Sequence, residues 1–297
     1  MTTQTRPIAS IKLNRSWQLF RLIIPYIGLI VGMSTILSDR NLHLELLLPT
    51  YVFTAITGLG FTVGYHRLFA HRSFEAVKPV KICLAILGLM GAHLTISEYG
   101  GIHRAHHATS DRPGDPHSPR LAKGFWRGFW YSHTGWLFAA DLDIEALKHK
   151  YASDLVKDRV ISQLDKLHFL WVGLGLILPS LLGWVIFGNV EGAITGFFWW
   201  GLIRMFLQDQ IEFCTRGLAH YWGDRDFETT DYSTNHPIAL LSLGEWHNNH
   251  HAFPYSANQG LKPWQLDFNY FAIATLEKLG LVSNVKRVSL QEIKQKS

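Results

Sequence analysis

The chain has 297 residues, of which 47% are hydrophobic and 17% charged, and it contains 11 tryptophans. The charged fraction lies below the roughly 25% of soluble domains, which favours a membrane protein, but a mean hydropathy of only +0.06 argues against a chain embedded wholly in lipid. The net charge of +5 fits a basic face against anionic lipid, and it does not predict nucleic-acid binding, because no basic stripe with interleaved aromatic residues accompanies it.

Four apolar stretches, taken in chain order, predict two membrane hairpins. Residues 19–37 and 46–65 are joined by a short turn, and residues 169–187 are followed by a second turn and a return within 188–207. A spanning helix needs about 20 apolar residues, which each stretch approaches. Basic residues precede the first stretch and fill the segment between the hairpins, so we expect a multi-pass integral membrane protein with both termini in the cytoplasm. A cleaved signal peptide is disfavoured, since a second span follows at once.

A fifth apolar run covers residues 82–97 and lies between histidine clusters. If it crossed the bilayer, those clusters would lie on opposite sides and could not share one metal site, so we predict a helix that dips into or lies on the membrane. Residues 66–168 and 208–297 are then a cytoplasmic helical cap. No Pro-, Ser- or Gly-rich linker divides the chain, so residues 1–297 are predicted to form a single all-α domain with four transmembrane helices.

Histidine clusters are the strongest chemical signal in the sequence. Two copies of the pattern HxxHH occur, and a third cluster has two histidines five residues apart. On a helix, residues i, i+3 and i+4 share one face, so each HxxHH presents three imidazoles and two such faces can clamp two metal ions. These eight residues are His66, His71, His103, His106, His107, His247, His250 and His251.

The first cluster differs, because i and i+5 point about 140° apart on an ideal helix. We therefore expect it at a helix end, or its two histidines on different metals. Imidazole suits iron, zinc, copper and nickel, so ligand type does not choose the metal. Carboxylates and amides near the clusters are candidates to orient the imidazoles: Asp111, Asp115, Asp231, Asn235, Glu245, Asn248 and Asn249. His43, His149 and His168 stand alone and are expected to be ordinary core or interface side chains.

The two cysteines, Cys83 and Cys214, lie in no metal-binding spacing, so neither a disulfide framework nor an iron–sulfur cluster is predicted.

The segments GYHRLFAHRSF, IHRAHHATSDRPGDPHSP and GEWHNNHHAFPYSANQG, the last followed by WQLDF, carry these clusters. In them the sequence resembles the membrane fatty-acid desaturase family, in particular the delta-9 acyl desaturases, from about residue 64 to 281. The resemblance implies two iron ions, O2 as oxidant and two externally supplied electrons per turnover. It also implies a ninth metal ligand, His220.

Two departures from the family pattern accompany the resemblance. Arg216 stands where relatives have an asparagine that helps to hold a metal-bound water. A cation cannot ligate a metal, so the state of the second metal position stays open at this point. The third cluster also has one residue fewer between Glu245 and Trp246 than is common among relatives.

The function that the resemblance implies is O2-dependent introduction of a cis double bond, expected at delta-9, into a saturated acyl chain on coenzyme A, carrier protein or glycerolipid. A diiron hydroxylase, acetylenase or decarboxylase is the alternative, since the oxidant is shared. A membrane metal transporter or cytochrome would place its histidines inside the spans, whereas these follow span ends. No haem, flavin or iron–sulfur motif occurs, so a separate ferredoxin or cytochrome b5-like donor is expected on the basic face.

Small residues line the face of the second span that leads back from His66: Thr62, Gly58, Ala55, Thr54 and Thr50. Small residues let membrane helices approach closely, and this explains such a stripe without any ligand. The functional interpretation is that the stripe leaves room for an acyl tail. In that case its depth would be set near Thr50 and Thr54.

Overall fold

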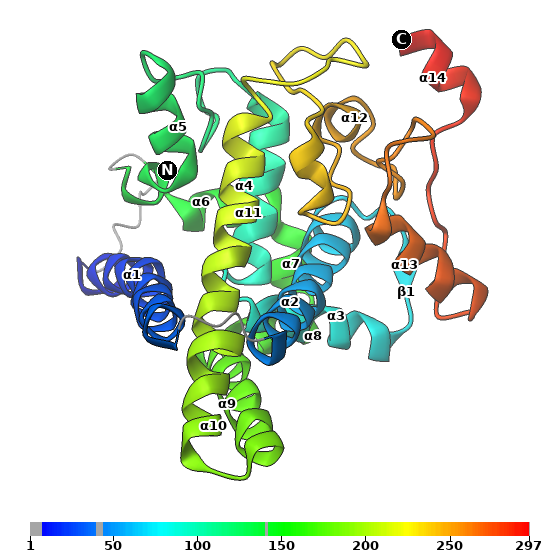
Figure 1. Cartoon of the computed structure of the whole chain (residues 1–297). Helices are drawn as coiled ribbons and strands as arrows, with labels where there is room; N and C mark the ends of the chain where they lie inside the picture. The colour runs from blue at the N-terminus through cyan, green and yellow to red at the C-terminus, as the bar shows by residue number, and fades with distance from the viewer. Residues whose placement is uncertain (1–7, 40–43, 140–141, 297) are drawn as a thin grey trace.

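The computed structural model describes residues 8–39, 44–139 and 142–296, which are mostly helical (Figure 1). The predicted helical class is confirmed, with one addition: β1 and β2 pair antiparallel. The elements in chain order are α1 (Ile8–Asp39), α2 (Leu44–Leu59), the π-helix η1 (Gly60–Ala70), β1 (Glu75–Ala76), α3 (Lys78–Met90), α4 (Ile96–Thr109), α5 (Phe125–His133), the 3-10 helix η2 (Gly135–Phe138), α6 (Ile144–Tyr151), α7 (Ser153–Lys157), α8 (Arg159–Lys166), α9 (His168–Phe187), α10 (Val190–Thr195), the π-helix η3 (Gly196–Ile203), α11 (Arg204–Leu218), the 3-10 helix η4 (Pro237–Leu240), α12 (His247–Ala252), α13 (Phe268–Lys278), β2 (Val282–Ser283) and α14 (Leu290–Lys296).

Three described helical segments are long and apolar enough to cross a membrane: Ser16–Ser34, Leu44–Ala70 and His168–Phe187. They overlap three of the four predicted spans. The fourth, residues 188–207, forms α10, η3 and the start of α11, and it is not among the three. Arg204 lies within it, fully buried, and donates hydrogen bonds to the carbonyls of Met90 (3.0 Å) and Gly175 (2.9 Å). Length and composition therefore support three spans in the described residues.

The second predicted hairpin is formed by α9, α10 and η3, which occupy the lower part of Figure 1. The Ser180 hydroxyl donates to the Ala193 carbonyl at 2.8 Å. A Cβ on Gly196 would lie 2.2 Å from the Pro179 carbonyl oxygen, so only glycine permits this approach of the two backbones. Helix α1 packs against η3 and α11, which joins the N-terminal helix to this hairpin.

The apolar run 82–97 is divided between two helices, so the prediction of one continuous helix is wrong. Helix α3 ends at Met90, Ala92 adopts a positive φ of 62°, and α4 begins at Ile96 behind a capping box of Thr95 and Glu98. The 13 residues of α3 extend about 20 Å, less than the roughly 30 Å of the hydrocarbon core. The histidines on either side of the run meet, as expected for a segment that does not cross: His71 Nε2 lies 2.7 Å from His103 Nε2.

The π-helix η1 explains the unusual spacing of the first histidine cluster. The His71 amide donates to the His66 carbonyl at 3.0 Å, a hydrogen bond that spans five residues. Residues five apart therefore lie one turn apart, and the two rings meet edge to face with centroids 4.9 Å apart. His71 caps the helix, so the expectation of a helix end is confirmed. The alternative was that the two histidines serve different metals, and the structure places both in one cluster with His103 and His250.

Two arginines, Arg67 and the partly exposed Arg104, tie the histidine-bearing elements together. Arg104 of α4 donates to the carbonyls of Phe69 (2.7 Å) and Ala70 (2.8 Å) and to the carboxylate of Asp154. Arg67 of η1, fully buried, pairs with Asp267 at 3.0 Å and with Glu245 at 2.8 Å. These bonds fix η1 against α4 on one side and against the C-terminal segments on the other.

Of the three isolated histidines, the two that the structure describes, His149 and His168, contribute to neither of the histidine groups described below. His149 is exposed and contacts Glu145 at 2.9 Å, and His168 is buried with its ring edge-on to Trp17. His43, and the N-terminal residues 1–7 that entered the prediction of topology, lie outside the described residues.

Candidate metal centre

The fold brings all nine predicted histidines into one buried region. Within each of two groups, one nitrogen from every residue lies within 4.8 Å of the others. Group A is His66, His71, His103 and His250, and group B is His106, His220, His247 and His251. His107 lies with His250 and His251 in a third set that overlaps both groups. Each HxxHH pattern thus contributes to both groups.

The nitrogens approach one another at the separation expected of neighbouring metal ligands. The Nε2–Nε2 distances are 3.1 Å for His66 and His250, and 2.9 Å for His220 and His247. Metal–imidazole bonds of about 2.1 Å at right angles place adjacent nitrogens about 3 Å apart. The residues present therefore fit metal ions in both groups.

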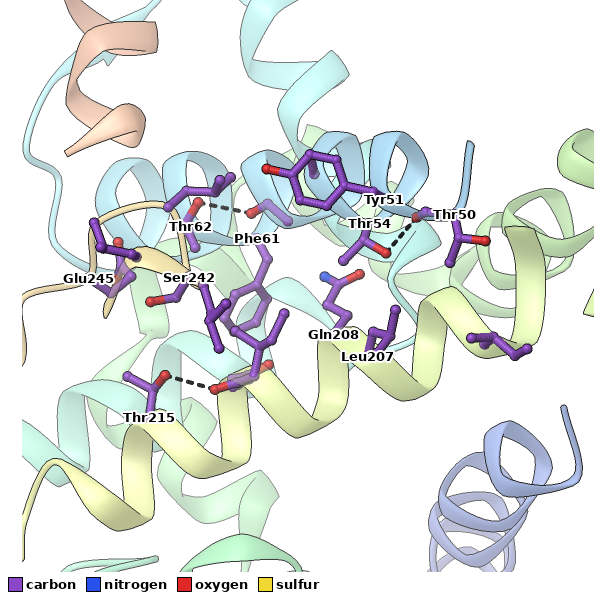
Figure 2. Close-up of a pocket in the computed structure, with 18 of the residues that line it drawn as sticks. Thr50, Tyr51, Thr54, Phe61, Thr62, Leu207, Gln208, Thr215, Ser242 and Glu245 are labelled. Carbon is purple, nitrogen blue, oxygen red and sulfur yellow. Dashed lines mark hydrogen bonds between the residues drawn. The ribbon is translucent and has the colours of Figure 1, made fainter. Parts of the chain in front are cut away.

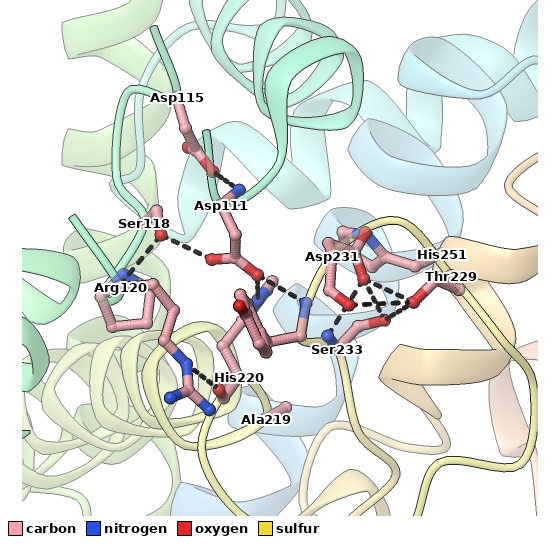
Figure 3. Close-up of polar contacts among 12 residues, drawn as sticks. Asp111, Asp115, Ser118, Arg120, Ala219, His220, Thr229, Asp231, Ser233 and His251 are labelled. Carbon is pink, nitrogen blue, oxygen red and sulfur yellow. Dashed lines mark hydrogen bonds and ion pairs between the residues drawn. The ribbon is translucent and has the colours of Figure 1, made fainter. Parts of the chain in front are cut away.

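Carboxylates hold the opposite ring nitrogen of four of the histidines. Figure 3 shows Asp111 against His220 and Asp231 against His251; in both pairs Nδ1 lies 2.7 Å from a carboxylate oxygen. The third pair in group B is His106 with Asp115 at 2.9 Å, and in group A Glu245 contacts His66 Nδ1. A proton on Nδ1 facing the carboxylate leaves Nε2 with a free lone pair. All four predicted carboxylate partners are therefore in position.

The three asparagines predicted as partners of the imidazoles lie one layer further from the centre than the carboxylates do. Asn235 accepts from the amide of Asn248 at 2.9 Å, and the Asn248 side chain donates to the carbonyls of Phe227 and Ser233. Asn249 donates to Gln259 O at 2.7 Å. In the described contacts these amides bond backbone, other amides, the Ser233 hydroxyl and the Asp226 carboxylate, so they position the surrounding loops and do not hold imidazoles directly.

Two polar side chains at the centre were missed in the sequence. The Gln259 amide lies 3.2 Å from His250 Nδ1, and His117 stacks on His106 with ring centroids 4.4 Å apart. His117 also forms a cluster with His106 and Asp115. Both residues lie in the segments that resemble the desaturases, but no local spacing connects either to a cluster.

Burial favours the neutral form of six of these imidazoles. It lowers the pKa well below the usual 6.5 for His71, His103, His107, His247 and His250. It also lowers the pKa of His251 to about 4, although Asp231 opposes this. Burial alone would raise the pKa of Glu245, but His66 and Arg67 hold it below its usual value. Neutral imidazoles beside ionised carboxylates are the state that binds a metal cation.

An apolar cavity of about 460 Å³ leads away from the histidines (Figure 2). Helix α2 with η1 forms one wall and η3 with α11 the other, and side chains of α1 such as Met33 also line it. His66, His103, His247 and His250 lie at its polar end. The predicted stripe does line this cavity: Thr50, Thr54, Ala55, Gly58 and Thr62.

Arg216 lies on the cavity wall, outside both histidine groups. Its guanidinium pairs with Glu212 at 3.2 Å and lies over the rings of Phe213 (5.0 Å) and Trp136 (5.6 Å). The arginine therefore has a buried partner of its own, and group B consists of four histidines without it.

The chain belongs to the fatty acid desaturase family: the model of the family "Fatty acid desaturase" matches residues 44–274. The hex-5-enoyl-[acyl-carrier protein] acetylenase of Moorena producens is 38% identical over 284 residues, which cover 92% of this chain and 87% of the relative. The sn-1 stearoyl-lipid 9-desaturase of Synechocystis is 33% identical, with 93% and 81% covered. Delta-9 acyl-lipid desaturase 1 of Arabidopsis thaliana is 32% identical, with 92% and 86% covered.

Family and structure together define an oxidoreductase of lipid metabolism with buried histidine clusters suited to metal. Its described part also contains candidate membrane-spanning helices.

Proposed function

We propose that this protein is an O2-dependent fatty-acyl desaturase that holds one iron ion in each histidine group. The nine ligands would be His66, His71, His103, His106, His107, His220, His247, His250 and His251. The observation that carries the proposal is the convergence of four imidazole nitrogens in each group at the separations of neighbouring metal ligands, with carboxylates against the Nδ1 atoms of four of these eight histidines. Bound iron would supply the activation of O2 that removal of hydrogen from a methylene requires.

The residues of the chain would determine where that chemistry falls. The cavity wall is almost entirely apolar, so it favours a hydrocarbon chain over water. A chain lying along Thr54, Gly58 and Thr62 would present one pair of methylenes to His66 and His250. Holding reacting groups in one geometry accounts for a large share of enzymatic rate enhancement. The position of the double bond would therefore depend on which methylenes the cavity holds beside the histidines.

The double bond is proposed at delta-9 of a saturated chain, in line with the 9-desaturases among the relatives. An acetylenase is the second candidate, and the specific observation in its favour is the 38% identity to the Moorena acetylenase. The substrates named for these relatives also suggest that the acyl chain is carried by a glycerolipid or by an acyl-carrier protein. Two electrons per turnover would come from a separate donor protein.

We further propose four spans, with α10 and η3 as the fourth, within a single domain of residues 1–297 with both termini in the cytoplasm. The antiparallel packing of α10 and η3 along α9 supports the fourth span, since it returns the chain to the side of the histidines.

The decisive test is expression in a host that lacks delta-9 desaturation, fed with deuterated stearate and, in parallel, with hexenoyl thioester. Mass spectrometry of the lipids is expected to reveal loss of two deuterons at C9 and C10, and elemental analysis about two irons per chain. A triple bond formed from the hexenoyl chain would favour the acetylenase. Unchanged lipids despite a fully iron-loaded protein would overturn both.

A further inference from the structure

The loop of residues 229–232 lies directly over group B (Figure 3). Its Asp231 carboxylate contacts His251 Nδ1 at 2.7 Å. The amide of Tyr232 donates to Asp111 at 2.8 Å, and the same carboxylate oxygen contacts His220 Nδ1 at 2.7 Å. Two of the three carboxylates on group B are thus attached to a loop at the protein surface, and Tyr232 is 54% exposed.

Three exposed arginines surround this loop. Arg225 donates to the Asp231 carbonyl at 2.7 Å, and Arg112 to the Thr230 carbonyl at 3.4 Å. Arg120 donates to the backbone carbonyl of His220 at 2.8 Å. Each arginine therefore connects a surface charge to backbone that borders group B.

Exposed aromatic side chains continue the patch along the cap. The Arg120 guanidinium lies between two rings, 4.4 Å from Tyr221 and 4.6 Å from Tyr232. Phe125 packs against Tyr221 (4.9 Å), Trp222 (4.7 Å) and Trp126 (5.0 Å). Trp222 is 53% exposed and Trp126 is 77% exposed. We call this patch the arginine–tryptophan strip: Arg112, Arg120, Trp126, Tyr221, Trp222, Arg225 and Tyr232.

The composition and position of the strip point to a protein partner. Tyrosine, tryptophan and arginine are the residues that dominate the binding energy of protein interfaces. Exposed tryptophans also occur at membrane surfaces, but α5 and the loop after α11 lie at the end of the molecule opposite the α9–α10 turn (Figure 1). The strip is also separate from the acyl cavity, whose lining comes from α1, α2, η1, α4, η3, α11 and residues 240–250. A partner that delivers the acyl chain would dock at the cavity instead.

The charge of the surface indicates an acidic partner. The exposed side chains of residues 112–130 and 221–232 include Arg112, Arg120, Lys123, Arg127 and Arg225, against Asp224 and Glu228, a net charge of +3. Complementary charge steers diffusional encounter and sets orientation.

We propose that the arginine–tryptophan strip is the docking site of an acidic one-electron carrier protein, and that electrons enter the centre at group B. The inference rests on the proposed function. In each turnover two carrier molecules are oxidised by one electron each, O2 takes up these electrons, two protons and two hydrogens of the acyl chain, and two waters leave. The hydrogen-bonded route from Tyr232 through Asp111 to His220 connects the surface to the centre in two steps.

The test uses the full-length, detergent-solubilised protein with an acidic plant-type [2Fe–2S] ferredoxin as probe. The variant Arg112→Glu, Lys123→Glu, Arg127→Glu reverses one charge of the strip and two exposed charges that flank it in the sequence. Arg120 and Arg225 are kept because their hydrogen bonds to backbone are short (2.8 and 2.7 Å), whereas that of Arg112 is long (3.4 Å). The matched control is Lys78→Glu, Lys157→Glu, Lys278→Glu, three exposed lysines elsewhere on the chain. Turnover is driven in parallel by reduced ferredoxin and by dithionite, and ferredoxin binding to the iron-free protein is measured by surface plasmon resonance.

We expect the strip variant to raise the KM for ferredoxin about tenfold, to weaken ferredoxin binding to the iron-free protein similarly, and to reduce the dependence on salt, while dithionite-driven turnover and the control variant stay unchanged. Trp222→Ala should weaken binding without changing charge. Unchanged ferredoxin binding in both variants would overturn the proposal, as would selective loss of binding to acyl-carrier protein or anionic vesicles. Absence of dithionite-driven turnover in the unmodified protein would instead count against the proposed function, and the binding assay would still decide the docking site.

Discussion

The two histidine groups differ in what surrounds them. In group B, three of four imidazoles contact a carboxylate: His106, His220 and His251. In group A the described carboxylate contact is that of Glu245 with His66, and His250 contacts an amide. Three of the four members of group A line the apolar cavity, whereas in group B only His247 does, and the loop of residues 229–232 contacts His251 and the partner of His220.

This difference suggests a division of work between the groups. Carboxylates behind ligating imidazoles raise their basicity and compensate the charge of the metal, so they strengthen binding. Group B is therefore suited to retain its metal ion and to receive electrons from a donor at the protein surface. Group A, with less negative charge and an apolar wall, is suited to meet a hydrocarbon chain.

The largest expected effect concerns His250, the member of group A that also lies in the third set, with His107 and with His251 of group B. Its Nε2 lies 3.1 Å from that of His66 and 2.8 Å from that of His107, and His251 follows it in α12. We expect His250→Ala to reduce turnover at least a hundredfold and the iron content to one or fewer per chain, while the protein still inserts into the membrane. His106→Ala, in group B, should do the same.

The measurement is iron per chain by elemental analysis together with product formation in isolated membranes. His149→Ala, an exposed histidine paired with Glu145, is the matched control and should leave both unchanged. Normal turnover in His250→Ala would remove that residue from the centre.

The second prediction tests whether the carboxylates of group B account for tighter binding. In the unmodified protein, a chelator should remove one iron faster than the other, and we assign the faster to group A. Asp231→Asn should weaken iron binding in group B by about ten- to a hundredfold, because the loss of such a partner typically has that effect. The two release rates should then converge, as followed by the iron remaining per chain over time. Glu245→Gln should separate them further, and if both variants change the same rate, the proposed contrast fails.

The sequence predicted the members of this site better than their grouping. The helix-face argument for HxxHH identified His103, His106 and His107 as metal-facing, and all three lie at the centre. It did not reveal that each pattern divides between the groups, with His103 in A and His106 in B. That division depends on how α4 and α12 oppose each other, which local spacing does not encode. His220 came from the family resemblance alone, and Gln259 was missed because its contact depends on tertiary packing.

The helices of the fold were predictable where the sequence has a long apolar stretch or a clear hydrophobic periodicity. The candidate spans at 19–37, 46–65 and 169–187 follow from long apolar runs, of which only the first contains a charged residue, Arg21. The π-helix η1 was not predictable, because i→i+5 hydrogen bonding has no hydrophobic period of its own, and packing against α3 fixes it: a Cβ on Gly60 would meet the Gly88 amide at 2.3 Å. The break at Ala92 was hidden in an apolar run, since alanine rarely takes a positive φ.

A third prediction concerns the pH dependence of stability in the iron-free protein, to which the titration of His251 in group B contributes. Its pKa is about 4 in the folded protein against 6.5 in the unfolded chain. Between these values the unfolded chain binds more protons, so the stability of the iron-free protein rises with pH across this window and is lost as pH falls from 6.5 towards 4. Melting temperature at pH 4.5 should therefore lie several degrees below that at pH 7, with little change from pH 7 to 8. His251→Gln should flatten part of this slope, and an unaltered slope would show that His251 is not buried neutral.

The smallest effect is expected in the cavity of group A, where a substitution should change selectivity and leave the centre intact. Thr54 is buried and lines the cavity on the side of α2, away from the histidines, and Thr50 lies one turn further (Figure 2). A tryptophan at either position fills the far end, so a long acyl tail no longer fits, while the methylenes beside His66 are placed as before. We expect Thr54→Trp or Thr50→Trp to shift the products towards shorter chains without moving the double bond, as read by mass spectrometry of the lipids.

Val52→Trp is the matched control, because Val52 lies on the same helix, 43% exposed and outside the cavity lining. If Thr54→Trp and Thr50→Trp bind two irons and give the same chain-length profile as Val52→Trp, the acyl tail does not lie along this wall. Group A could then be the group that faces the substrate only if the acyl chain reached it through a different channel.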